Sequence, residues 1–135
     1  MHLIDKFSLQ EHEGEYENRP LKSLLYYCGE SLERKVSGYV IDKQFELVDY
    51  FLLFLSWDCP FEEGCEILVL NKLQKIVGSY SFTPFYNSYN LSVVSELSKD
   101  QYKLTFNESD NFKVMVNYPK KHLLSKVVTV SAIDV

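Results

Sequence analysis

The pattern of apolar positions is clearest in the middle of the chain. Tyr50–Leu55 is a run of six apolar residues, too short to span a membrane and of the right length for a strand buried on both faces. A second apolar run follows at Ile67–Leu70. Pro60 and Gly64 interrupt regular structure between the two runs, so the pattern predicts a strand, a loop and a second strand.

Most other segments alternate apolar and polar residues over short distances. The clearest is a hairpin, in which Tyr102–Phe106 alternates, residues 107–111 form the turn, and Phe112–Tyr118 alternates back. The same reasoning predicts strands at Tyr39–Phe45, Tyr50–Trp57, Glu66–Leu70, Lys75–Phe82, Tyr89–Glu96 and Val127–Val130. We therefore expect a mainly β fold of the α+β class, an antiparallel β-sandwich or partly open barrel of about seven or eight strands.

The amino-terminal region is expected to differ from this pattern. Asn18 and Pro20 suit the start of a helix, and the apolar residues of Leu21–Cys28 recur at helical spacing. We predict one helix there, although the same letters also fit a buried strand. Residues 1–19 are polar with glutamates at alternate positions, which is typical of a mobile or edge arm. No repeat or linker divides the chain, so one domain, 1–135, is expected.

Charge is distributed unevenly along the chain. The formal net charge is −5, with 14 acids and 6 bases in residues 1–66 and 5 acids and 8 bases in residues 67–135. The amino-terminal half therefore projects a negative field, which repels nucleic acid and favours a basic protein partner. We expect no nucleic-acid partner and no membrane partner.

The residue types that carry chemistry are few. The three cysteines form no regular framework and Met1 does not begin a signal peptide, so free thiols and a cytoplasmic location are expected. The three histidines lie in polar surroundings and are expected to be exposed. The chain has no glycine-rich phosphate loop, nucleophile elbow or metal-spaced histidine pair. These features predict no catalytic residue, cofactor or metal, but active sites assembled from distant residues leave an enzyme open.

The first candidate site is the loop between the two apolar runs. It concentrates four carboxylates, Asp58, Glu62, Glu63 and Glu66, beside two thiols. Neighbouring negative charges keep thiols protonated, so a cysteine nucleophile is disfavoured. The loop is either a solvated turn or a set of carboxylates presented to a basic partner.

The second candidate is the segment 79–90, in which aromatic residues alternate with Ser, Asn, Thr and Pro. Tyr80, Phe85, Tyr86 and Tyr89 have the composition of a recognition loop, since such rings give large contact area at low entropic cost. Alternatively, these rings cover one end of the core.

The stretch Trp57-Asp58-Cys59-Pro60-Phe61-Glu62-Glu63, followed by a strand ending Leu68-Val69-Leu70, resembles small bacterial immunity proteins of contact-dependent and polymorphic toxin systems. The resemblance covers about a quarter of the chain. It implies a non-catalytic, cytoplasmic protein that neutralises a basic toxin by tight binding.

The sequence thus predicts a non-catalytic acidic binding protein. In this interpretation the carboxylates of the acidic loop pair with Lys or Arg of the partner, and the aromatic residues of 79–90 supply apolar anchors. Two other classes stay open. One is a β-barrel carrier of a small ligand, which requires a lined cavity, and the other is a small enzyme that uses Asp58 or Glu63 as acid or base.

Overall fold

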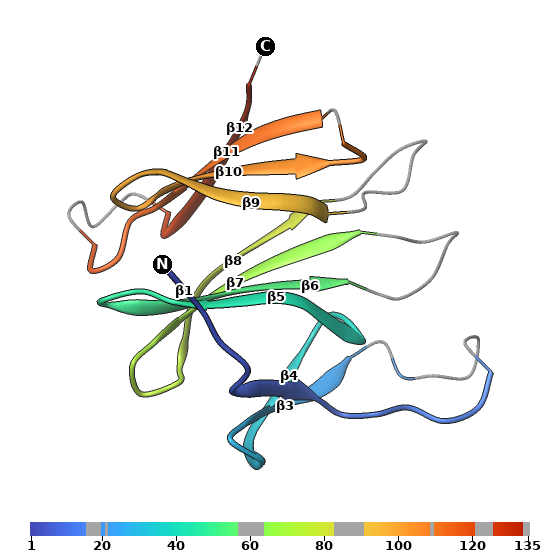
Figure 1. The fold of residues 1–135 in the computed structure, drawn as a ribbon. Coiled ribbons are helices and arrows are strands. Elements are labelled where there is room, and N and C mark those ends of the chain that lie inside the picture. The colour runs from blue at the N-terminus through green and yellow to red at the C-terminus, as the bar shows by residue number, and fades with distance from the viewer. Residues whose placement is uncertain are drawn as a thin grey trace.

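The computed structural model describes residues 1–15, 20, 22–56, 64–82, 91–108, 110–120 and 126–133. These residues form twelve strands in three antiparallel sheets, which do not close into a barrel. The sheets lie as three layers, one above the other (Figure 1). The mainly β, antiparallel prediction is confirmed.

The middle layer is the central sheet, in the order β1-β5-β6-β7-β8. Its strands are β1 (His2–Leu3), β5 (Val40–Glu46), β6 (Tyr50–Ser56), β7 (Cys65–Asn71) and β8 (Ile76–Phe82). Strand β6 lies in its middle, and residues 50–55 are all buried. Tyr50, Leu52 and Phe54 point to one face, and the residues between them point to the other. The prediction of a strand buried on both faces is confirmed.

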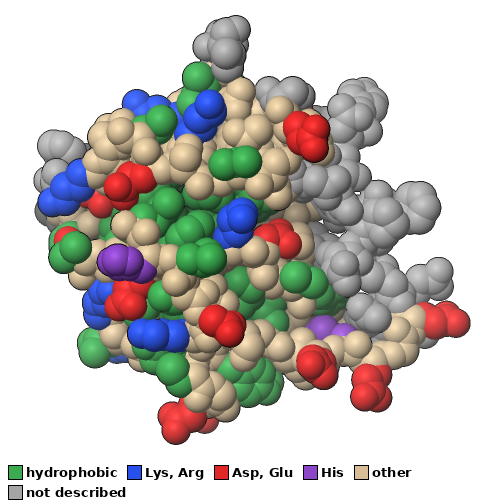
Figure 2. All heavy atoms as spheres, in the orientation of Figure 1, with side chains coloured by type: hydrophobic (Ala, Val, Ile, Leu, Met, Phe, Trp, Pro, Cys, Tyr) green, Lys and Arg blue, Asp and Glu red, His purple; other side chains and the backbone are tan. Residues whose placement is uncertain are grey.

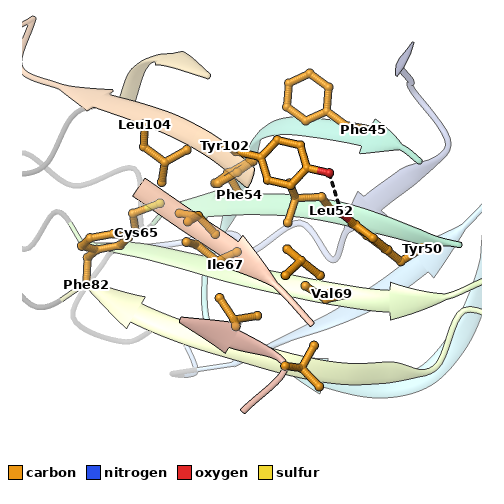
Figure 3. Close-up of a cluster of buried hydrophobic side chains, with 14 of the residues drawn as sticks. Phe45, Tyr50, Leu52, Phe54, Cys65, Ile67, Val69, Phe82, Tyr102 and Leu104 are labelled. Atoms are coloured by element: carbon orange, nitrogen blue, oxygen red, sulfur yellow. Dashed lines mark hydrogen bonds between the residues drawn. The ribbon is translucent and has the colours of Figure 1, made fainter. Parts of the chain in front are cut away.

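One face of the central sheet packs against the carboxy-terminal sheet, in the order β12-β11-β10-β9. Its strands are β9 (Leu91–Ser98), β10 (Gln101–Phe106), β11 (Asp110–Val116) and β12 (Val128–Ala132). Figure 3 shows Tyr102 and Leu104 of this sheet above Phe54 and Ile67 of the central sheet. All four side chains are fully buried, so the space between the two sheets is a filled core.

The opposite face packs against the amino-terminal sheet, in the order β2-β3-β4. Its strands are β2 (Phe7–Leu9), β3 (Ser23–Tyr27) and β4 (Glu30–Val36). The predicted helix at 21–28 is therefore wrong, since Ser23–Tyr27 is a strand. Leu25 of this strand is fully buried against the central sheet, and Cys28 and Gly29 have positive φ angles of 50° and 82° in the turn that follows. Burial of Leu25 against the central sheet and the turn at Cys28 and Gly29 favour a strand at Ser23–Tyr27, although the leucines have helical spacing.

The described part of the amino-terminal arm fits the edge alternative of the prediction. Residues 1–19 were expected to be mobile or at an edge. The described part of this arm supplies the edge strand β1 of the central sheet and the edge strand β2 of the amino-terminal sheet. Phe7 is only 3% exposed and packs against Phe51, with ring centroids 5.1 Å apart.

A buried amide joins the amino-terminal sheet to the central sheet. Gln44 of β5 is 8% exposed. Its Oε1 accepts hydrogen bonds from the backbone N–H groups of Lys6 and Phe7, at 3.0 and 2.8 Å, and its Nε2 donates to the Phe7 carbonyl at 2.9 Å. The side chain thus satisfies three backbone groups at the start of β2.

A glycine lies where the central sheet meets the carboxy-terminal sheet. Gly78 of β8 lies opposite Val69 on the face that meets the carboxy-terminal sheet. A Cβ atom at this position would lie 2.6 Å from Cβ of Val127 and 3.4 Å from Cγ2 of Val128. The edge strands β8 and β12 can therefore meet only where residue 78 has no side chain.

Candidate functional site

Most of the acidic and aromatic residues singled out from the sequence lie outside the described residues. These are Asp58, Glu62, Glu63, Phe85, Tyr86 and Tyr89. The structure describes Glu66 on β7 and Tyr80 on β8. Glu66 is opposite Leu55, whose side chain faces the amino-terminal sheet, and Tyr80 is opposite Ile67, whose side chain faces the carboxy-terminal sheet. The two side chains therefore lie on opposite faces of the central sheet and share no surface.

The Glu66 carboxylate is partly desolvated. Burial raises its pKa above the ordinary value, while a hydrogen bond from the Ser81 hydroxyl and the charge of Lys22 act in the opposite direction. Desolvation is the largest of these effects. The folded chain thus binds a proton at Glu66 more readily than the unfolded chain does.

The raised pKa of Glu66 predicts a pH-dependent effect of the Glu66→Gln substitution. The folded state holds the proton to higher pH than the unfolded state, so the stabilising contribution of protonation is lost as pH rises through the folded-state pKa. The amide of the Glu66→Gln variant does not titrate, so the variant does not lose this contribution. The melting temperature of the variant minus that of the parent protein should therefore increase from pH 4 to pH 7. Thermal melts over this range, with Glu30→Gln at an exposed position of β4 as control, measure the change. A constant difference across the range would contradict the prediction.

The thiol of Cys65 is buried and protonated, and is therefore expected to be unreactive. It begins β7, is 2% exposed and faces the core shared with the carboxy-terminal sheet. Burial raises its pKa far above the ordinary value, and the charges of Asp42 and Glu66 raise it further. The expectation that this thiol stays protonated agrees with the structure, but burial contributes more than the neighbouring carboxylates.

The clearest cluster of polar side chains lies at the end of the core where the β5–β6 and β9–β10 turns meet. A pocket of about 430 Å³ opens there and is lined by Tyr50, Asp100 and Tyr102, among others. The Tyr50 hydroxyl donates to Oδ1 of Asp100 at 2.7 Å, and the Tyr50 and Tyr102 hydroxyl oxygens are 2.5 Å apart (Figure 3). Because the Tyr50 proton is directed to Asp100, Tyr102 donates to Tyr50.

This tyrosine pair is a structural link. Burial raises the pKa of both phenols, that of Tyr102 to about 12, so both remain protonated at neutral pH. Each hydroxyl proton is already directed to a protein acceptor, and neither phenol is available as a base. The hydrogen bonds connect β6 to the β9–β10 turn, in which Asp100 has a φ angle of 62°. Their role is to hold the central and carboxy-terminal sheets together at this end.

The rim of the same pocket carries paired charges. Glu46 accepts hydrogen bonds from Lys72 at 3.0 Å and from Lys6 at 3.4 Å, and the Lys72 bond is the main cause of the lowered pKa of Glu46. Lys72 also lies 4.5 Å from the centroid of the Phe51 ring. These are exposed ion pairs, which contribute little to stability and are typical of a solvated rim.

Three exposed acids lie on the segment that follows β2. Glu11, Glu13 and Glu15 are exposed, and Figure 2 shows acidic side chains over this segment at the lower right. Two other residues of this segment, Gln10 and His12, are half-buried. Gln10 exchanges hydrogen bonds with Leu24 through its backbone and side chain.

His12 also anchors this segment, and it is half-buried rather than exposed as expected. Its Nε2 lies 2.8 Å from the Ser23 hydroxyl, which donates to the carbonyl of Gly38 at 2.6 Å. Nε2 of His12 therefore carries a proton and donates to Ser23. The ring also packs edge-on against Tyr39, with centroids 5.1 Å apart. The alternation of glutamates in the sequence indicated the exposed side of this segment, but not the buried partners of the opposite side.

Among the described residues, no group of three or more His, Cys, Asp or Glu side chains is arranged to hold a metal ion. In the same part of the chain, no helix has the length and apolar character needed to cross a membrane. Comparison with protein-family models, curated proteins and solved structures gives no significant match.

Proposed function

We propose that the protein is a non-catalytic, cytoplasmic binding protein that recognises a basic protein partner through acidic groups, as an immunity protein of a toxin system does. The observation that carries the proposal is the exposure of Glu11, Glu13 and Glu15 on a segment whose half-buried side chains are anchored. Carboxylates held in place before binding lose less conformational entropy when a partner arrives. Their field also steers a cationic partner and raises its association rate at low salt.

Two further features support a binding surface over the other classes. The space between the central and carboxy-terminal sheets is filled by buried side chains, which supports surface recognition over an interior ligand cavity. The Cys65 thiol and the Tyr50 and Tyr102 phenols are buried, with pKa values that keep them neutral at physiological pH. Buried groups that stay neutral in this way do not supply a nucleophile or base.

The acidic segment can be tested by pull-down from the host lysate at low and high salt, with the purified protein as bait. We expect one stoichiometric basic partner that is lost at high salt. Glu11→Gln, Glu13→Gln and Glu15→Gln together should weaken its capture at least about tenfold while the melting temperature stays nearly unchanged. Glu30→Gln with Glu33→Gln, at exposed positions of β4, is the matched control.

A second variant addresses the loop acids, which lie outside the described residues. If they contact the partner, Glu62→Lys with Glu63→Lys should weaken binding steeply without lowering the melting temperature. Equal loss of folding and binding would assign this loop a structural role. No partner at either salt concentration, or capture unaffected by both sets of substitutions, would contradict the proposed function.

A further inference from the structure

The outer face of the carboxy-terminal sheet carries an ordered arrangement of side chains. Tyr102, Leu104 and Phe106 of β10 point into the core, so Gln101, Lys103 and Thr105 point outward. Residues opposite one another on neighbouring strands point to the same side, so the strand register groups the outward side chains into rows across the sheet. The middle row is Ser95, Lys103, Lys113 and Ser131.

Lys103 and Lys113 stand directly opposite each other in this row. Like charges at directly opposed positions of an antiparallel pair destabilise the sheet. Within the described residues neither lysine forms an ion pair. The nearest acid of the sheet by register, Glu96, is opposite the inward-facing Tyr102 and therefore does not lie on the outer face. Among the described residues, the lysine pair is thus a positive charge without an ion-pair partner at the centre of this outer face.

Apolar side chains border the lysine pair. Val93 is opposite Thr105 and Met115 is opposite Gln101, which places both on the outer face in the rows flanking the lysines. Leu97 is the extra residue of β9 where its pairing with β10 shifts register, next to the row of Gln101 and Met115. Their exposed fractions are 52% for Val93, 42% for Met115 and 49% for Leu97. Three large apolar residues left in solvent around a charged centre are a feature of interaction surfaces.

We propose that this outer face, with Lys103 and Lys113 at its centre, is a docking surface for an acidic protein segment that carries apolar residues beside its carboxylates. The positive charge of the lysine pair calls for carboxylates on the partner, and the apolar border calls for apolar residues beside them. A symmetric pairing with a second copy of this face would bring lysines against lysines and is disfavoured. Single-stranded nucleic acid would require aromatic side chains for base stacking, and the described outer positions of β9–β12 carry none.

This surface is separate from the one assigned to the basic partner. The acidic segment belongs to the layer of the amino-terminal sheet, and the lysine pair belongs to the opposite outer layer, with the central sheet between them (Figure 1). Both surfaces can be occupied at once. The inference therefore goes beyond the proposed function and does not depend on it.

The test is an NMR titration of the ¹⁵N-labelled full chain with a ten-residue synthetic peptide of alternating Glu and Leu. We expect salt-sensitive shift changes confined to the outward positions of β9–β12. Lys103→Ser with Lys113→Ser should weaken binding at least about tenfold. Lys35→Ser with Lys75→Ser, at exposed positions away from this sheet, is the matched control and should bind as the parent protein does.

A second measurement separates a binding role from a merely structural one. Lys113→Glu replaces the like-charge pair by an opposite-charge pair, so it should raise the melting temperature by about 2 °C while abolishing peptide binding. No peptide binding, equal binding of a peptide with Gln in place of Glu, or shift changes on another sheet would overturn the proposal. Vesicles of an anionic lipid serve as a competing probe. Lysine-dependent vesicle binding without peptide binding would also overturn it, in favour of a membrane surface.

Discussion

Replacing Gln44 by leucine is expected to lower the free energy of unfolding by about 3 kcal/mol, because three backbone groups at the start of β2 lose their partner together. The Gln44 amide accepts from the N–H groups of Lys6 and Phe7 and donates to the Phe7 carbonyl. Leucine has a similar volume and leaves these groups unpaired in a partly or fully buried place. A buried backbone group without a partner costs about 1–3 kcal/mol.

Urea denaturation and thermal melts measure this loss, which corresponds to a fall in melting temperature of about 10 °C for a domain of this size. The matched control is Gln101→Leu, the same substitution at a half-buried position of β10, which should change stability by less than about 0.5 kcal/mol. Hydrogen exchange should show Phe7 N–H losing protection first. Equal effects of the two substitutions would mean that the Gln44 hydrogen bonds contribute little.

Gly78→Ala is expected to destabilise the protein by about 2 kcal/mol through overpacking between β8 and β12. The new Cβ would lie 2.6 Å from Cβ of Val127, and neither atom is the end of a flexible side chain. Relief therefore requires one of the two backbones to move, which disturbs the contact between the central and carboxy-terminal sheets.

A double-mutant cycle isolates this contact. Val127→Gly removes the opposing Cβ, so Gly78→Ala should cost nearly nothing in that background, and the coupling energy should be about 2 kcal/mol. Both single variants are measured by urea denaturation, since each is expected to remain folded. Additive effects of the two substitutions would show that the clash is relieved in some other way.

The carboxy-terminal two thirds of the fold could be predicted from the sequence. All eight predicted strands correspond to β5–β12, because each combines an apolar run or a clear alternation with turn residues at its ends. Strands β1, β2 and β4 were not predicted, and β3 was considered only as the alternative to a helix. Strands β1 and β2 have two and three residues, which is too short for a periodic signal. Strand β4 is mostly exposed and carries charges at Glu30, Glu33, Arg34 and Lys35.

The same limits apply to the candidate sites. The sequence places Glu66 and Tyr80 within apolar strands but does not give the register that sends them to opposite faces. The Tyr50–Tyr102–Asp100 link joins residues about fifty positions apart, and each residue alone is an ordinary strand or turn residue. The Lys103–Lys113 pair becomes visible only when the hairpin register is known, since nine residues separate the two lysines in the sequence.

The burial of β6 on both faces has a consequence for synthesis of the chain. Apart from the short strand β1, the amino-terminal sheet leaves the ribosome first, then the central strands, and the carboxy-terminal sheet last. Until residues 91–132 emerge, one apolar face of the central sheet, with Leu52, Phe54 and Ile67, has no cover. That interval exposes the nascent chain to aggregation. Synonymous codons that slow translation within residues 91–132 should therefore lower the soluble yield more than the same codons placed within residues 1–36.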